Sequence, residues 1–198
     1  MASTGRSRPR RLGTALVAVV GSYLVARSER GQALEARVGT VLLRPRGARV
    51  DQVVAAGTDL GSVYGAAGVA TALAVAGRGR LARDVGGAAL TAWTAAQATK
   101  PLLGRPRPYE LDRAARLVAV PAGSSWPSGH AALAAAMAGA VAPALPRRAR
   151  VGVATTVGLV GLSRAYVGVH HPTDIAGGIG LGVLSAAAWR AVVGLSSR

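Results

Sequence analysis

Three short clusters of polar and charged residues interrupt an otherwise apolar sequence, and their residue types suit phosphate chemistry. The clusters occupy residues 100–108, 124–130 and 163–174. Lysine and arginine side chains bind phosphate oxygens, arginine in a bidentate fashion. Histidine acts as a nucleophile or as a general acid near neutral pH. If the fold brings the clusters together, they can bind a phosphoryl group and transfer it.

The second cluster is typical of the start of a helix that binds an anion. Pro127 suits the first turn of a helix, and Ser128 and Gly129 leave backbone N–H groups free to point at the ligand. Cations of the other clusters would neutralise charge that develops on the phosphoryl group. These cations are Lys100, Arg107 and Arg164.

The histidines suggest a division of labour. Asp174 follows His170 by four residues, with Pro172 between them able to begin a helix, so the carboxylate can reach back to the imidazole. Such a contact fixes the tautomer and raises the basicity of a nucleophile. His130 then remains to protonate the oxygen of the leaving group. His171 has a supporting or structural place in this scheme.

The order and spacing of these residues resemble the type 2 phosphatidic acid phosphatase superfamily. Residues 100–108 fit K-x6-R-P, residues 127–130 fit P-S-G-H, and residues 163–174 fit S-R-x5-H-x3-D. Members of the superfamily include membrane lipid phosphatases, soluble acid phosphatases and haloperoxidases. A single P-S-G-H would be a weak signal, whereas three motifs in order are specific.

The resemblance implies hydrolysis of a lipid phosphate or diphosphate, of the phosphatidate or polyprenyl type. It implies that His170 is the nucleophile that forms a phosphohistidine, that His130 is the acid, and that Asp174 is the partner of His170. It implies phosphate contacts from Lys100, Arg107, Ser128, Gly129 and Arg164. The implied mechanism requires no metal ion and no other cofactor.

Composition places this chemistry in a membrane rather than on nucleic acid. The 198 residues are 51% hydrophobic with a net charge of +16 and no cysteine, and the mean hydropathy is +0.34. The apolar content is too high for a disordered chain, and 16% charged residues is low for a soluble nucleic-acid binder. The absence of cysteine excludes disulfides and thiol catalysis. Alanine, valine, leucine and glycine supply the apolar mass, which favours helices packed through small residues.

Six stretches free of charged residues predict an all-α, polytopic membrane bundle of about six transmembrane helices. They occupy residues 12–26, 60–77, 85–99, 129–146, 151–163 and 175–189. Several approach the usual spanning length of about 20 residues only if a terminal cation reaches the headgroups. A soluble all-α protein is the alternative, but glycine-rich helices of this kind leave too little amphipathic surface.

We expect a basic N-terminal tail over residues 1–11 and one membrane-embedded phosphatase domain over residues 12–198, with residues 12–26 retained as a helix. Six helices put both termini on one side of the membrane. Each side carries 12 Lys and Arg residues, or 12 against 9 if Lys100, Arg107 and Arg164 are set aside for chemistry. This balance favours a cytoplasmic N-terminus in a multi-pass plasma membrane protein, with the active site at helix ends near the outer face.

Several other sequence features are interpreted as structural rather than catalytic. Residues 28–50 form an amphipathic surface segment with no assigned catalytic role, and Trp126 is interpreted as an interfacial anchor. The glycines of residues 177–182 indicate helix packing rather than a nucleotide-binding loop. Alone, Lys100 and Arg107 also fit boundary cations beside a membrane helix.

Two alternative functions remain open, and so does the substrate. A non-catalytic anion-binding membrane transporter or scaffold could use the same cations, but it leaves two matched histidines unexplained. A nucleic-acid-binding protein requires its arginines to share one face, whereas here they punctuate apolar runs. The abundance of Arg, Ala and Gly suggests a bacterial source and weakly favours polyprenyl carriers of the cell envelope. Monophosphate and diphosphate substrates fit equally, and the oligomeric state is undetermined.

Overall fold

A computed structural model describes residues 4–42, 47–112 and 116–196, and every regular element in these ranges is helical. The elements are α1 (Thr4–Arg27), α2 (Glu29–Leu42), α3 (Ala48–Gly57), η1 (Thr58–Gly61), α4 (Val63–Val75), α5 (Gly79–Thr99), η2 (Lys100–Leu102), α6 (Pro108–Asp112), α7 (Gly129–Val141), η3 (Ala142–Ala144), α8 (Arg147–Tyr166) and α9 (Pro172–Ser196). The expected all-α class is confirmed. Because α1 begins at Thr4, most of the expected basic tail continues the first helix.

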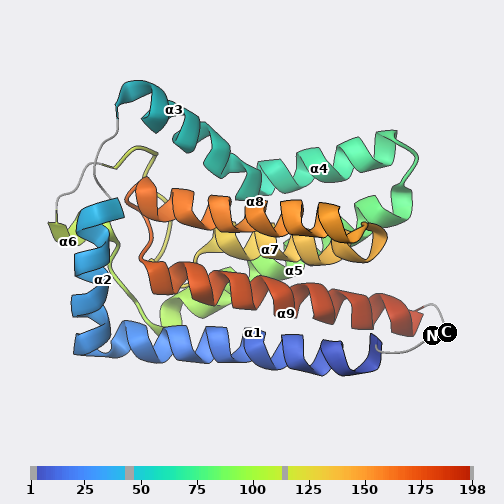
Figure 1. The fold of residues 1–198 in the computed structure, drawn as a ribbon, viewed down its shortest axis with the longest axis horizontal. Helices are drawn as coiled ribbons and strands as arrows, with labels where there is room; N and C mark the ends of the chain where they lie inside the picture. Colours follow the sequence, from blue (N-terminus) through green and yellow to red (C-terminus); the bar gives the residue numbers. More distant parts are fainter. Residues whose placement is uncertain (1–3, 43–46, 113–115, 197–198) are drawn as a thin grey trace.

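The long helices lie side by side along the longest axis of the molecule (Figure 1). The buried helix α7 packs against α5, α8 and α9, and α9 also packs against α1. The helix α2 turns across one end of the bundle, near α6. α1 begins and α9 ends together at the other end of the bundle.

Small residues set the spacing of the central helices. A Cβ built on Gly182 would lie 2.2 Å from the backbone oxygen of Ala132, and one on Gly180 would lie 2.6 Å from that of Ala15. Neither distance is possible for a real side chain, so α9 needs glycine where it crosses α7 and α1. The core between α5, α7 and α9 is correspondingly rich in alanine. These contacts confirm the packing interpretation of the glycines in residues 177–182.

The six apolar runs correspond to helices of the bundle, but their lengths differ. In the described part of the chain, only Pro172–Gly194 is by itself long and apolar enough to cross a membrane. The pair Ala48–Gly61 and Val63–Val75 passes the same test jointly, although it is bent by 65° at Ser62. The bend follows from a new helix start, since the Ser62 side chain accepts a hydrogen bond from the backbone N–H of Gly65. The count of about six spans stays a prediction.

The sides of the bundle expose many large apolar residues. On α1 these include Val17 and Leu24, which are 70% and 60% exposed. Leu90 and Leu159 on α5 and α8 are exposed to a similar degree. An apolar surface spread over several helices is typical of a protein that contacts lipid.

Candidate active site

The residues of the three sequence clusters come together at the end of the bundle that α2 crosses (Figure 1). Lys100 follows α5, Arg107 lies in the next loop, and Arg164 occupies the last turn of α8. Gly129 and His130 begin α7, and His170 directly precedes α9. His130 lies within electrostatic range of Lys100, Arg107, Arg164 and His170. Segments up to 70 residues apart therefore form one site.

His170 and Asp174 lie side by side as expected, but among the described residues Nδ1 of His170 has no hydrogen-bond partner. Pro172 begins α9, and its first turn brings Oδ2 of Asp174 to 3.6 Å from Nδ1 of His170. This distance is too long for a hydrogen bond, but it is short enough for the negative charge of Asp174 to act on the imidazole ring of His170. Both side chains are buried, at 4% and 0% exposure. Burial lowers the pKa of His170 to about 4, against the opposing effect of Asp174, so the imidazole is neutral at physiological pH and can act as a nucleophile.

Arg107 ties together the loops that surround His170. Its guanidinium donates hydrogen bonds to the backbone oxygens of Gly123 at 3.1 Å and Val169 at 2.9 Å. Its Nη1 also lies 3.4 Å from Nε2 of His170. The side chain is 1% exposed, and burial lowers its pKa. A cation is thus held against the ring nitrogen that faces away from Asp174.

Lys100 lies against the same loop as Arg107. Its Nζ donates to the backbone oxygen of Ser124 at 2.6 Å, and the Ser124 hydroxyl donates back to the Lys100 carbonyl at 2.7 Å. Gly123 makes this contact possible, because it has φ 70° and a Cβ there would lie 3.0 Å from the lysine chain. Burial, and then the charge of Arg107, lower the pKa of Lys100 to about 8.

Arg164 is the most enclosed cation on α8. It is 3% exposed, and its Nη1 donates to the hydroxyl of Thr58 at 2.9 Å. Ser163 donates to the same hydroxyl, so η1 holds the end of α8 in place. Among the described residues, Nε of Arg164 has no hydrogen-bond partner. A buried guanidinium with spare donors is suited to an anion.

The start of α7 differs from expectation at Pro127, which lies before the helix rather than in its first turn, and at Ser128, whose backbone N–H is not free. Pro127 precedes the helix in a cis peptide bond with Trp126, while Ser128 is the N-cap and its side chain accepts from Ala131. Ser128 is fully buried, and its backbone N–H donates to the Asp174 carbonyl at 2.9 Å. The first N–H groups of a helix lack partners within it, so those of Gly129 and His130 are the ones suited to an anion.

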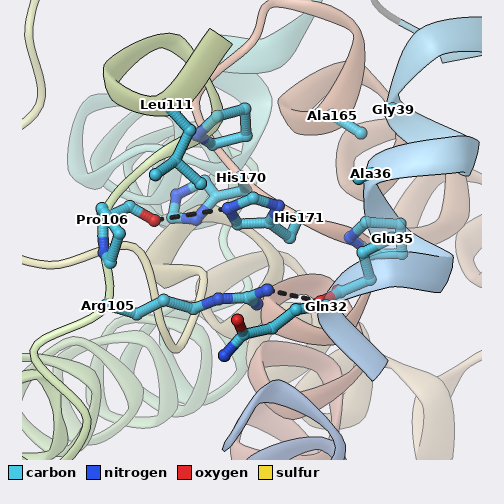
Figure 2. A pocket seen from close by; sticks show the side chains of 12 residues that line it. Gln32, Glu35, Ala36, Gly39, Arg105, Pro106, Leu111, Ala165, His170 and His171 are labelled. Atoms are coloured by element: carbon cyan, nitrogen blue, oxygen red, sulfur yellow. Dashed lines mark hydrogen bonds and ion pairs between the residues drawn. The ribbon is translucent and has the colours of Figure 1, made fainter. Parts of the chain in front are cut away.

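His171 belongs to a different side of the site. Its Nε2 lies 3.3 Å from the backbone oxygen of Pro106, and both line a cavity of about 200 Å³ together with α2 (Figure 2). Burial, followed by the charge of Arg105, lowers its pKa. Figure 2 shows His171 beside His170 but turned toward Pro106 and Leu111. Within the described ranges, no group of three or more His, Asp or Glu side chains could hold a metal ion.

Sequence reasoning overlooked two residues of the network around Asp174, namely Arg105 and Glu35. Arg105 lies inside the first motif at a position that the motif leaves undefined, and Glu35 lies in the segment given no role. Both are buried and bonded to each other. Trp126 is also not an interfacial anchor, since it is 3% exposed and its Nε1 donates to Ser22 on α1. The available sequence signal was the position of Arg105 inside a motif, whereas nothing in the sequence marks Glu35 as buried.

Solved structures share this arrangement of helices. LpxE from Aquifex aeolicus superposes with a TM-score of 0.71 at 22% identity, covering 80% of this chain and 95% of its own. A transmembrane PAP2-type phosphatidylglycerolphosphate phosphatase from Bacillus subtilis superposes with a TM-score of 0.69, also at 22% identity. That superposition covers 91% of this chain and 96% of the Bacillus chain. At this identity the likeness concerns the fold.

A family profile extends the likeness to the sequence. No curated protein sequence gives a significant match. The profile of the PAP2 superfamily, however, matches residues 81–198, which is more than half of the chain and includes all three clusters. The chain therefore belongs to the PAP2 superfamily.

Proposed function

We propose that this chain is a multi-pass membrane phosphatase that hydrolyses a lipid phosphate or diphosphate through a phosphohistidine on His170. The observation that carries the proposal is the placement of one buried imidazole between a carboxylate and an arginine. Its Nδ1 faces Asp174 at 3.6 Å, and its Nε2 faces Arg107 at 3.4 Å. A neutral ring held in this way presents Nε2 to an anion bound at the guanidinium.

In the first step, Nε2 of His170 attacks phosphorus and the bond from phosphorus to the leaving oxygen breaks. His130 takes part as an imidazolium, the form that a bound phosphate anion stabilises. It donates its proton to that oxygen, which belongs to the lipid alcohol or, in a diphosphate, to the remaining phosphate. The phosphorylated ring becomes a cation while its Nδ1 keeps its proton. The Asp174 carboxylate stabilises this charge without itself becoming protonated.

In the second step, a water molecule attacks the phosphorus of the phosphohistidine. His130 has already given up its proton, so it accepts one from the water. The bond between nitrogen and phosphorus breaks, and its electron pair returns to Nε2 of His170. Inorganic phosphate leaves, and both histidines regain their starting protonation states.

The remaining site residues hold the phosphoryl oxygens in this scheme. Lys100, Arg107 and Arg164 supply positive charge, and the backbone N–H groups at Gly129 and His130 supply donors at the positive end of α7. Ser128 contributes by capping that helix. The donor set neutralises developing charge by itself, so we propose a reaction that requires no metal ion.

The surface around the site supports membrane embedding and a lipid substrate. The site lies at one end of a bundle whose sides expose large apolar residues, and α9 is long enough to span. A phosphate group at this depth reaches the site while its lipid chain stays in the bilayer. The short basic connections lie at the opposite end, which supports an extracytoplasmic active site.

Phosphate release from a panel of lipids tests the proposal. The panel holds phosphatidic acid, phosphatidylglycerol phosphate, a polyprenyl phosphate and a polyprenyl diphosphate in detergent micelles with EDTA. We expect release from at least one lipid, inhibition by vanadate, and loss of release in His170→Ala. Lipid binding without turnover would contradict the proposal and favour the transporter or scaffold. A reporter fused to the C-terminus tests the orientation.

A further inference from the structure

A buried acid on α2 lies next to the start of α9. Glu35 is 4% exposed, although α2 lies at the end of the bundle. Its Oε1 accepts hydrogen bonds from the backbone N–H of Thr173 at 2.9 Å and from the Thr173 hydroxyl at 2.6 Å. A carboxylate in this place satisfies a free N–H in the first turn of α9 and matches the positive end of the helix.

Arg105 connects this acid to the catalytic carboxylate. Its Nη2 pairs with Glu35, and its Nη1 donates to Oδ1 of Asp174 at 2.9 Å. The same Nη1 lies 2.9 Å from the Thr173 hydroxyl. The arginine is 7% exposed, so its partners are shielded from water. Figure 2 shows the guanidinium reaching toward Glu35 just below the two histidines.

The two oxygens of Asp174 therefore have separate partners. Oδ1 binds Arg105, whereas Oδ2 accepts from the Ser125 hydroxyl at 2.5 Å and from the His171 backbone N–H at 2.7 Å. Oδ2 is also the oxygen that faces Nδ1 of His170. A carboxylate held at both oxygens cannot rotate, so the direction of its charge toward the imidazole is fixed.

We infer that Glu35 and Arg105 are positioning residues for catalysis, and that they act on His170 through Asp174. The inference rests on the proposed function, because it gives the network a task in phosphoryl transfer. Two buried carboxylates share one arginine, and that cation balances both charges where water cannot screen them. The helix α2 is then part of the active site rather than a surface segment.

Four variants separate positioning from simple stabilisation. Glu35→Gln keeps the acceptor for Thr173 but removes the charge that holds Arg105. Arg105→Lys keeps the cation but loses the two-pronged geometry, and Arg105→Met loses both. Glu29→Gln is the matched control, because it makes the same change on the same helix at an exposed residue.

The rate per active site is the decisive measurement. The amount of folded protein is measured from the monodisperse fraction in detergent, and kcat is divided by that amount. We expect kcat per site to fall about tenfold in Glu35→Gln and about 10- to 100-fold in Arg105→Met, with Arg105→Lys between wild type and Arg105→Met. We expect KM to stay within about twofold, because both side chains are bonded to protein groups and neither is among the residues proposed to hold the phosphate. Glu29→Gln leaves both constants unchanged.

A double variant tests whether Glu35 acts through Arg105. If it does, Glu35→Gln has no further effect on kcat in the Arg105→Met background. Additive losses would overturn the inference, as would a smaller folded fraction with an unchanged rate per folded protein. Loss of substrate affinity with unchanged kcat would also overturn it.

A second readout keeps this inference separate from the proposed function. If the wild-type protein released no phosphate from any lipid of the panel, the proposed function would fail. Thermal unfolding of Glu35→Gln, Asp174→Asn and their double variant then tests the network itself. Non-additive shifts in Tm would support the link from Glu35 to Asp174, and additive shifts would refute it.

Discussion

The two ends of the bundle use the same ion pair in opposite environments. At the end away from the site, Arg83 and Asp84 pair at 2.9 Å, with side chains 52% and 30% exposed. At the active-site end, Arg105 and Asp174 pair at the same distance, with side chains 7% and 0% exposed. Water screens the first pair, whereas the second is buried, so loss of either partner would leave the other charge without compensation. Burial, rather than residue type or distance, distinguishes the charges at this helix boundary from those inside the candidate site.

Matched substitutions of the two aspartates give the largest contrast. Asp174→Asn is expected to lower kcat about 10³- to 10⁴-fold, because an amide neither stabilises the cationic phosphohistidine nor holds the required tautomer. Asp84→Asn is expected to leave kcat unchanged. Phosphate release by both purified variants, at equal folded fraction, measures the difference. Equal activities of Asp174→Asn and Asp84→Asn would show that the buried carboxylate of Asp174 has no role in catalysis.

Two arginines of α8 extend the contrast along one helix. Arg164 lies buried in the last turn, and Arg148 is exposed in the first. Arg164→Met is expected to reduce kcat/KM about 10²- to 10³-fold, because a cation near the developing charge is lost. Arg148→Met is expected to change it less than about twofold. Steady-state kinetics on the same lipid check both, and a full-activity Arg164→Met would remove this residue from the site.

The pH dependence sharpens the comparison for Lys100. Its pKa is lowered to about 8, so its charge is present below that pH and is lost as pH rises through it. We therefore expect kcat/KM of the free enzyme to fall above pH 8. In Lys100→Arg this fall moves to higher pH, because a guanidinium stays charged there. A pH profile of both proteins is the measurement, and coincident basic limbs would show that Lys100 does not control the profile.

The smallest effect is expected at the exposed pair itself. Asp84→Asn is predicted to lower the free energy of unfolding by about 0–1 kcal/mol, as is usual for ion pairs in water. Its Oδ1 also accepts from Trp189, and an asparagine oxygen can keep that bond. Thermal unfolding in detergent gives the shift in Tm. A large loss would show that this end, too, relies on its charges.

Much of the site could be predicted because its residues are close along the chain or belong to a spaced motif. The return of Asp174 to His170 follows from helical geometry over four residues, with Pro172 at the helix start. The gathering of the clusters required only that α5, α7, α8 and α9 alternate in direction. The close spacing of glycines in residues 177–182 likewise predicted that α9 packs tightly against other helices.

Other features depend on contacts that sequence spacing does not encode. Glu35 contacts Thr173, which lies 138 residues away in the sequence. Because the residues on either side of Glu35 in α2 are exposed, the local sequence does not indicate that Glu35 is buried. Thr58 reaches Ser163 and Arg164 only because a 3₁₀ turn places it beside the end of α8. Trp126 fits an interfacial residue by type, yet packing against Tyr23 and Ser22 of α1 encloses it. Tertiary contacts decide such cases.

Trapping the phosphoenzyme tests the central claim most directly. Wild-type protein would be mixed with a lipid phosphate labelled at phosphorus, quenched in base to preserve phosphohistidine, and digested for mass spectrometry. We predict a label on the peptide that contains His170, at Nε2, and no label in His170→Ala. The neighbouring His171→Ala should keep the label. A label that persists in His170→Ala, or turnover with no labelled histidine, would contradict the assignment of His170 as nucleophile.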